Sequence, residues 1–429
     1  RVYDVAVIGV QLAITEAKTN GGVVWFPAGE YVITQLWKIE NSQKPITLMG
    51  TGPASVIKMG PAATFDQILA VINSAHIEIR NLRFDGNGSA QTTSKNRGIS
   101  FDRSPNCRVI DCIIHDCSAD STESHAVVLG NSPSGCVEGC SFYNNGATDV
   151  LIFTTRPVSM KVRTPEIDDR FISAALGIVP ASDMCSVTNC QMGIRDATLI
   201  PDSPATSRGQ AAFRAISVQD SAHCTIANNR IYGARRHYRP LGTAPSDTRG
   251  SAIALRDCFF CTITGNIADG FAWGRGLVWG SGNDLRGVGT HFRRQDNVLS
   301  DVGTKIAISG IQNKLFTIVS ISNPDTSQIL VIDPALPVSI PSNQPVKYRC
   351  TLTGDLIALD GCQHCTVTGN IAQWSHDNGF SLGASDGHKS RALRYCTFSG
   401  NVARYCYTAG FVLDGLSEFC NFVGNVAHN

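Results

Sequence analysis

Two pairs of cysteines have the spacing that can hold a metal or carry out redox chemistry. Cys258 and Cys261 lie in "ALRDCFFCTITGNIADG", and Cys362 and Cys365 lie in "ALDGCQHCTVTGNIAQW". Two Cys-x-x-Cys pairs in one chain are typical of a zinc site, and a single pair can exchange a disulfide. The two stretches also resemble each other along their whole length, so the pairs have to be weighed against a sequence repeat.

A stretch rich in acids and histidines could carry out acid/base chemistry. "HDCSADSTESH" starts at His115, and Asp149 follows one repeat later. Carboxylates on neighbouring turns of a repeat could form the acid/base pair of a glycoside hydrolase, whereas the alternative is a solvated loop. The candidate catalytic residues of this stretch are Asp116, Glu123, His125 and Asp149, with His115 and Asp120 beside them.

A basic stretch, "ARRHYR", has the residue types that a polysaccharide lyase uses. An arginine can neutralise the carboxylate of a uronic acid and acidify the neighbouring C–H, and a tyrosine or histidine can then remove the proton. The alternatives are a basic surface loop and a subunit contact. We predict catalytic roles for Arg236, His237 and Tyr238 and substrate binding by Arg235 and Arg239.

A third stretch, "WSHDNG", places an aromatic ring beside polar groups. Trp374 could stack on a sugar, while His376 and Asp377 could act as base and orienting group. The alternative is a turn after a strand. No run of residues indicates a cofactor, so none is expected, and no residue is assigned as a metal ligand. The sequence lacks the ladder of acids typical of a calcium site, so calcium stays open but unsupported.

The elements that would position these residues form a repeat of nine rows. Each row reads as a cysteine or small residue, an alternating stretch with a central apolar residue, and a second cysteine or an asparagine. The first column is Ile77, Cys107, Gly135, Cys185, Cys224, Cys261, Cys365, Cys396 and Cys420. The second column is Leu82, Cys112, Cys140, Cys190, Asn229, Asn266, Asn370, Asn401 and Asn425.

These columns explain the cysteine pairs without a metal. Cys261 and Cys365 belong to the first column, where most rows carry a cysteine that has no Cys-x-x-Cys partner. A small apolar residue suits an inward-facing position of a stacked repeat, so we expect buried, unpaired thiols. A zinc site that joins two adjacent rows stays open as the alternative.

Rows of short strands indicate a solenoid. Stretches such as "SAIAL", "CTIT" and "NIA" are too short to be stable alone, but stacked in parallel each would pair with the rows above and below. The chain is therefore predicted to be all-β, a parallel β-helix. We place the asparagine column at a bend, because asparagine adopts the left-handed conformation easily and can bond to the next row.

The first residues resemble the opening of the pectate-lyase superfamily of right-handed parallel β-helices. The stretch Gly9 to Thr34 contains Gly21-Gly22 and then "FPAGEY", after a helix that we predict over Val5 to Lys18. The resemblance implies that this helix caps the open end of a right-handed solenoid. It implies a fold and does not specify a reaction.

One segment does not follow the repeat. Between the rows at Cys261 and Cys365, the alternating strands and Asn/Gly/Asp turns predict a small antiparallel β domain at 275–349, inserted between β-helix segments 1–274 and 350–429. The pattern "FTIVSISNPDTSQILV" is similar to modules of phage tail proteins, which implies a tailspike-like protein.

Composition narrows the class of partner. The 429 residues carry a formal net charge of +1 and no apolar run of transmembrane length, so we expect neither nucleic-acid binding nor membrane insertion. Five loops are predicted to meet at the corner that follows the asparagine column and to form a polysaccharide site there. They begin at His115, Tyr143, Thr154, Tyr232 and Gln373.

Together these features predict an extracellular or virion-surface enzyme that cleaves a polysaccharide, by β-elimination or by hydrolysis. A homotrimer is expected, because three solenoids side by side would each bury one face. The alternatives are a glycan-binding or structural spike without catalysis and a β-helix enzyme that converts fructans or uronates.

Overall fold

The structure is a computed structural model. It describes residues 1–5, 9–91, 96–117, 124–155, 181–194, 214–234, 250–273, 277–288, 290, 302–311, 314–322, 328–351, 354–383, 392–414 and 417–428. None of the helices in this described part of the chain combines the length and the hydropathy needed to cross a membrane.

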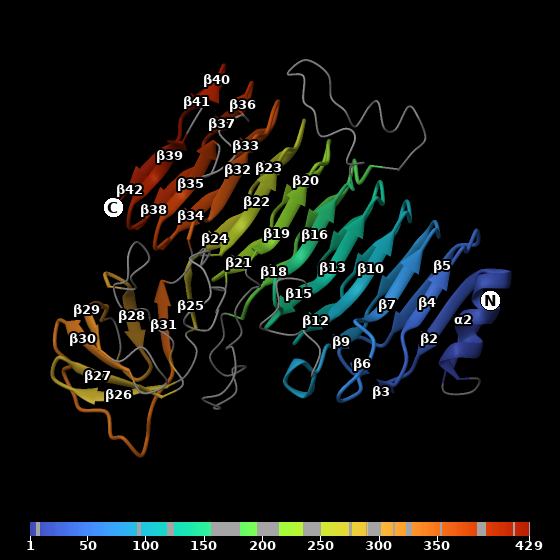
Figure 1. Cartoon of the computed structure of the whole chain (residues 1–429), viewed down its shortest axis with the longest axis horizontal. Helices are drawn as coiled ribbons and strands as arrows, with labels where there is room; N and C mark the ends of the chain where they lie inside the picture. The colour runs from blue at the N-terminus through green and yellow to red at the C-terminus, as the bar shows by residue number, and fades with distance from the viewer. Residues whose placement is uncertain are drawn as a thin grey trace.

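Three parallel sheets run side by side along a solenoid, as Figure 1 shows. Sheet A contains β1 (Val2–Asp4), β2 (Gly22–Phe26), β5 (Ile46–Gly50), β8 (Ile77–Arg80), β11 (Arg108–Ile110), β14 (Cys136–Glu138), β17 (Ser186–Thr188), β20 (Thr225–Ala227), β23 (Thr262–Thr264), β33 (Thr366–Thr368), β37 (Thr397–Ser399) and β41 (Asn421–Val423).

Sheet B follows sheet A in each turn of the solenoid. It contains β3 (Gly29–Ile33), β6 (Ser55–Met59), β9 (Arg83–Asp85), β12 (Ile113–His115), β15 (Ser141–Tyr143), β18 (Gln191–Met192), β21 (Arg230–Tyr232), β24 (Ile267–Asp269), β34 (Ile371–Gln373), β38 (Val402–Arg404) and β42 (Val426–His428).

Sheet C completes each turn and leads into the next. It contains β4 (Trp37–Glu40), β7 (Gln67–Ile72), β10 (Arg97–Asp102), β13 (His125–Gly130), β16 (Thr148–Phe153), β19 (Arg214–Gln219), β22 (Ser251–Arg256), β32 (Ile357–Asp360), β35 (Asn378–Gly383) and β39 (Ala409–Asp414). The predicted all-β parallel β-helix is confirmed. Two short strands, β36 (Leu393–Arg394) and β40 (Ser417–Glu418), pair outside these sheets, and a 3-10 turn covers Gly88–Ala90.

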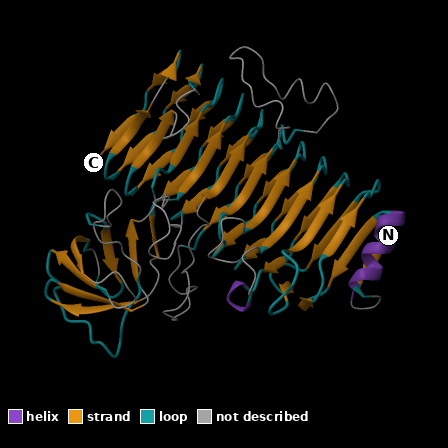
Figure 2. Cartoon of the chain, viewed as in Figure 1, coloured by secondary structure: helices purple, strands orange, loops and turns teal. Residues whose placement is uncertain are grey.

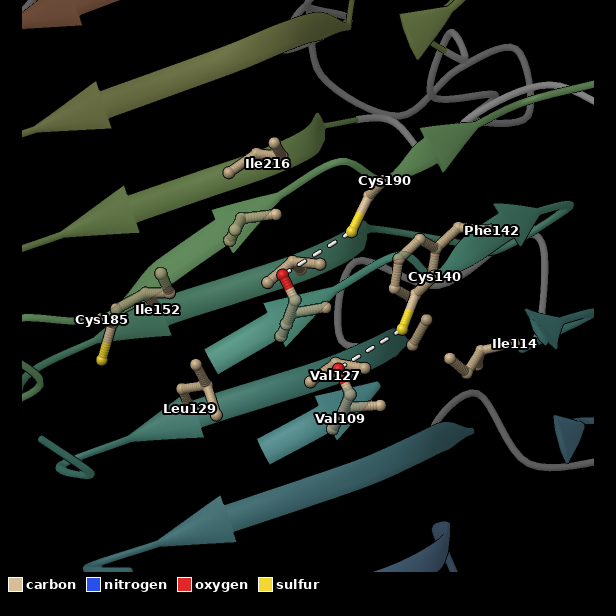
Figure 3. Close-up of a cluster of buried hydrophobic side chains, with 14 of the residues drawn as sticks. Val109, Ile114, Val127, Leu129, Cys140, Phe142, Ile152, Cys185, Cys190 and Ile216 are labelled. Atoms are coloured by element: carbon tan, nitrogen blue, oxygen red, sulfur yellow. Dashed lines mark hydrogen bonds between the residues drawn. The ribbon is translucent and has the colours of Figure 1, made fainter. Parts of the chain in front are cut away.

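The core consists of apolar rungs that continue from turn to turn. In sheet A, Val109 pairs with Ile79 on one side and with Val137 on the other, and all three are buried. Figure 3 shows Val109 in the interior together with side chains of sheet C, such as Val127 and Ile152. The sequence rows therefore align in the same way as the strands pair, so that residues of one column lie beside one another in neighbouring strands.

Most of the cysteines are buried, unpaired members of this core, as the ladder interpretation predicts for the two columns. Their thiols donate to backbone carbonyls, such as Cys140 Sγ to the Val109 oxygen at 3.5 Å and Cys261 Sγ to the Phe259 oxygen at 3.4 Å (Figure 3 shows the first). Burial raises the pKa of Cys107 to about 12. Cys420, in the last row, is half-exposed.

The asparagine column forms a ladder of buried amides. The Asn266 side chain donates to Asn370 Oδ1 at 2.9 Å and to the Ile226 carbonyl at 2.9 Å, and the same oxygen of Asn370 accepts the Asn266 backbone N–H. The predicted left-handed conformation belongs to the preceding residue instead, such as Gly265 with φ +65° and Asn228 with φ +57°. The ladder residue itself turns inward, because its amide has to reach the neighbouring turns.

A helix covers the first turn of the solenoid, as the resemblance implies. Helix α2 spans Val10–Asn20, not Val5 to Lys18, and buries Ala13, Ile14 and Ala17 at the end of the solenoid (Figure 2). Val5, where the predicted helix starts, is also helical, residues 6–8 lie outside the described residues, and Gly9 with φ +79° separates Val5 from α2.

The inserted sheet stands beside the solenoid near its C-terminal part, as Figure 1 shows. Its seven antiparallel strands are β25 (Phe271–Trp273), β26 (Leu277–Ser281), β27 (Asp284–Val288), β28 (Lys305–Ile308), β29 (Phe316–Ser322), β30 (Ile329–Asp333) and β31 (Tyr348–Thr351). They enclose a separate apolar core, and the predicted antiparallel insertion is confirmed.

Candidate functional site

The candidate residues that the structure describes lie at one corner, between the end of sheet B and the start of sheet C. His115 ends β12, and Trp374 directly follows β34, so two of the predicted loops leave the same edge. Thr154 does not belong there. It follows β16 of sheet C, so the loop that begins at this residue leaves the opposite edge of that sheet.

His115 is the centre of a hydrogen-bonded cluster at this corner. Its Nδ1 lies 2.6 Å from an Asp116 carboxylate oxygen, and its Nε2 accepts a hydrogen bond of 2.8 Å from Arg83 Nε. In this tautomer Nδ1 is the nitrogen that donates to Asp116. Its ring stacks on Tyr143 at 4.7 Å. Asp116 is 41% exposed, whereas the His115 side chain is 3% exposed.

Among the residues that the structure describes, this cluster has a spacing of ligand atoms that could suit a cation. Ligand atoms of Asp85, His115 and Asp116 lie within 4.8 Å of one another. Both nitrogens of His115 are already bonded, to Asp116 and to Arg83, and Asp85 lies 3.8 Å from Lys58 Nζ. These cationic partners balance the carboxylates, so the residues fit a positioning network better than a metal site.

Asp149 lies inside the corner and not on its surface. It is fully buried and accepts a hydrogen bond of 2.9 Å from Asn145 Nδ2. The same asparagine amide donates to the Ile114 carbonyl, and its oxygen accepts the Cys117 backbone N–H at 3.1 Å. Asp149 therefore holds the Asn145 side chain that joins two turns of the solenoid.

A column of polar side chains opens the strands of sheet C. In most of its strands the first residue is partly exposed and the next two are buried, as in β10, β19 and β22. The strand pairing places these first residues beside one another, together with Asp355, which lies two positions before β32. In order along the solenoid, the column is Arg97, His125, Thr148, Arg214, Ser251, Asp355 and Asn378.

Two groups of this column have perturbed acidity. Burial, together with the charge of Asp377, raises the pKa of Asp355, even though Asn378 Nδ2 donates a hydrogen bond of 2.9 Å to it. Burial and the nearby Arg256 lower the pKa of Arg214. Ionisable groups that are partly desolvated beside a like charge are typical of functional sites.

The middle of sheet C presents neutral side chains between two polar columns. The strand pairing runs through Ser100, Val128, Leu151, Ser217, Ala254, Ala358 and Ser381, so five of these seven side chains are small. The far side of the strip carries charges, among them Arg256, whose Nε lies 3.5 Å from an Asp360 oxygen. A strip with a neutral, mostly small centre and charged margins leaves room for a polymer that lies along the solenoid axis.

The tryptophan loop contributes rings and one carboxylate. Trp374 stacks on Tyr405 at 4.4 Å and leans on Phe271 at 5.6 Å, so neighbouring rings cover its faces. His376 is buried and stacks on Tyr407 at 5.2 Å. Asp377 precedes Asn378 in the chain and is the group beside Asp355.

The remaining predicted site residues lie outside the described residues. They are Asp120, Glu123, Arg235, Arg236, His237, Tyr238 and Arg239. The sequence analysis missed Arg97, Arg214 and Asp355, because it aligned the rows on sheets A and B. An alignment of the residue before each sheet C strand, such as Ser251 in "SAIAL" with Asp355 in "DLIAL", would have identified the column.

The comparisons with known proteins agree with this architecture. Residues 97–293 match the family model described as the right handed beta helix region. This part of the chain is a right-handed β-helix. The matched range covers strands β10 to β24 and the first strands of the insertion. No curated protein is similar enough in sequence to count as a relative.

Solved structures of the same general shape have several roles. The A-module of the mannuronan C-5 epimerase AlgE4 from Azotobacter vinelandii has 10% identity and a TM-score of 0.47, covering 100% of this chain and 96% of that one. An alginate lyase from Paenibacillus sp. has 11% identity and a TM-score of 0.47, covering 98% and 97%. The surface adhesin PfbA of Streptococcus pneumoniae has 11% identity and a TM-score of 0.48, covering 100% and 93%. At these values the likenesses decide nothing about activity.

Proposed function

We propose that this protein binds an extracellular, anionic polysaccharide along sheet C and hydrolyses it with Asp355 and Asp377. The observation that carries the proposal is the raised pKa of Asp355, caused by burial and by the neighbouring Asp377. A carboxyl group whose pKa is raised can serve as the general acid of a glycoside hydrolase, with a second carboxylate beside it as base or nucleophile.

The polar column supplies substrate binding for this reaction. Arg97 and Arg214 lie on either side of His125, and Arg214 is two strands from Asp355. Neighbouring strands are about 4.8 Å apart, so the column from Arg97 to Asp355 extends over roughly 24 Å, the length of a few sugar units. Guanidinium groups bind carboxylates or sulfates in pairs of hydrogen bonds, which favours an anionic glycan.

Elimination is the second candidate, and a separate observation favours it. His125 is flanked by Arg97 in the column, and an arginine beside an imidazole is the arrangement that can neutralise a uronate and remove its C5 proton. The predicted extracellular location and homotrimer accompany either reaction and stay predictions.

A product assay on a panel of bacterial and plant polysaccharides tests the proposal. Hydrolysis produces reducing ends without new ultraviolet absorbance, whereas elimination produces both. We expect reducing ends alone, from anionic polymers and not from neutral ones. Arg214→Ala should raise KM at least tenfold, with Asp284→Asn on the inserted sheet as the control. Unsaturated products would establish the second candidate, and binding without any cleavage would establish a non-catalytic spike.

A further inference from the structure

The outer face of sheet A changes character halfway along the solenoid. Its early strands carry ion pairs, such as Arg80 with Glu78 at 3.2 Å and Arg108 with Glu138 at 3.6 Å. From β17 onward, six consecutive rows contain no aspartate, glutamate, lysine or arginine. The rows are 184–190, 223–229, 260–266, 364–370, 395–401 and 419–425, which we call the neutral face.

Hydroxyl groups are repeated across the neutral face in two columns. The strand pairing aligns Thr262 with Thr366 and then Thr397, and it aligns Thr264 with Thr368 and then Ser399. These side chains point away from the core, because the residue between them is a buried rung in every strand. Each hydroxyl can donate and accept hydrogen bonds, so the face offers the same pair of groups at every turn.

A rail of aromatic rings borders the hydroxyl columns. His223, Phe260, His364, Tyr395 and Phe419 stack in sequence with ring centroids 4.9–5.1 Å apart and interplanar angles of 6–14°. Phe260, Tyr395 and Phe419 are 43%, 49% and 74% exposed. All five residues have φ between +51° and +55°, a conformation that bulky residues rarely adopt. The same turn also has a positive φ in earlier rows, at Asn106, Ser134 and Met184, so these five rows differ only in that the turn position carries a stacked ring.

We propose that the neutral face binds an uncharged, extended polysaccharide that lies along the solenoid axis, such as a β-1,4-linked glucan. An extended chain repeats its hydroxyls at a spacing close to that of parallel strands, and its apolar C–H groups can pack on the ring rail. An anionic chain fits poorly, because its charges would lose water without gaining a cationic partner. This site is distinct from the proposed site on sheet C.

The size of the face argues against a second copy of this chain as the occupant. Six rows by five residues cover roughly 24 Å by 13 Å, or about 300 Å². A stable protein interface needs about 800 Å² from each partner. A polymer can instead bind a small, repetitive face along its length and gain affinity from repeated contacts.

Retention of the full chain on microcrystalline cellulose tests the proposal. We expect the wild type to be depleted from solution and the triple variant Thr262→Val, Thr366→Val, Thr397→Val to bind at least fivefold more weakly. Valine keeps the shape and strand preference of threonine and removes only the hydroxyl. Thr47→Val is the matched control, because Thr47 stands in the same column on β5, in the charged part of sheet A, and should not change binding.

Other results would overturn the proposal. They are a wild type that is not retained, a triple variant that binds as the wild type does, and retention that Arg214→Ala abolishes. Self-association that Tyr395→Ala removes, measured by light scattering, would instead identify the face as an interface between copies. Cleavage of soluble substrate should not change in the triple variant, so failure here and failure of the proposed hydrolysis can be told apart.

Discussion

Asp355 combines a perturbed pKa with a place in the proposed substrate-binding column. It stands in the polar column of sheet C, two strands from Arg214, and its pKa is raised by burial and by Asp377. His115 has the opposite arrangement, because Arg83 and Asp116 occupy both of its nitrogens. We therefore assign proton transfer to Asp355 and a positioning role to the His115 cluster.

The raised pKa of Asp355 also predicts how stability depends on pH. The folded protein holds this proton more tightly than the unfolded chain does, so the contribution to the free energy of unfolding is present at low pH and is lost as the pH rises through the raised pKa. Asp355→Asn keeps the shape of the side chain without its charge. At pH 7 it should raise the free energy of unfolding by up to about 1 kcal/mol, and therefore raise Tm.

Thermal unfolding of the two proteins between pH 4 and pH 8 checks this prediction. The difference in Tm should be small at pH 4 and grow towards pH 8. Asp284→Asn, on an exposed position of the inserted sheet, should show no such trend. A Tm for Asp355→Asn that lies below the wild type at pH 8 would mean that the carboxylate is stabilised in the fold.

At the scale of the elements, the turn from sheet A to sheet B repeats in every row. One residue has a positive φ, and the next turns its side chain inward, as a leucine or cysteine in the early rows and as a member of the asparagine ladder in the later ones, such as Asn370 after Gly369. The first position accepts glycine, asparagine or aspartate, as Gly265, Asn228 and Asp111 show. Side-chain size is therefore less important there than tolerance of the left-handed conformation.

This turn predicts a graded response to substitution at Gly369. A Cβ atom at this position would meet no other atom within 4 Å, so conformational strain decides the effect. Gly369→Ala should lower the free energy of unfolding by about 1 kcal/mol, and Gly369→Asn should cost less, because asparagine adopts φ +63° more easily. Denaturant unfolding measures both. Equal losses for the two variants would contradict this account of the turn.

The elements could be predicted from the sequence where one residue type repeats in register. The cysteine and asparagine columns gave the rungs and the ladder, because each row buries the same position. The left-handed residue was misplaced by one position, since Gly265 and Asn266 both suit a bend and the sequence does not show which side chain turns inward. Asp355 and Arg214 were missed because their column mixes charges, hydroxyls and amides, so no single residue type marks it.

At the scale of the whole molecule, the solenoid and the inserted sheet have separate cores. The turns on either side of the insertion are direct neighbours, since β22 pairs with β32, β23 with β33 and β24 with β34. The two ends of the insertion also meet, because Ala272 pairs with Cys350. The solenoid is therefore continuous without the inserted sheet, as the sequence analysis expected.

Deletion of 273–349 with a short Gly/Ser link should leave a folded β-helix. The link has to span only the distance between two paired strands, about 5 Å. Circular dichroism and a cooperative thermal transition check the result, and several link lengths control for strain at the junction. Aggregation at every link length would show that the inserted sheet contributes to the folding of the solenoid.

The central claim is that Asp355 is the general acid of a hydrolase, and the most direct test is the rate at which Asp355→Asn cleaves a polysaccharide that the wild type cleaves. We predict a loss of kcat of at least 100-fold, the scale of general acid catalysis, with a similar loss for Asp377→Asn. The wild-type rate should fall as the pH rises through the raised pKa of Asp355, because the carboxyl group must be protonated to act. A kcat for Asp355→Asn within twofold of the wild type would contradict the account.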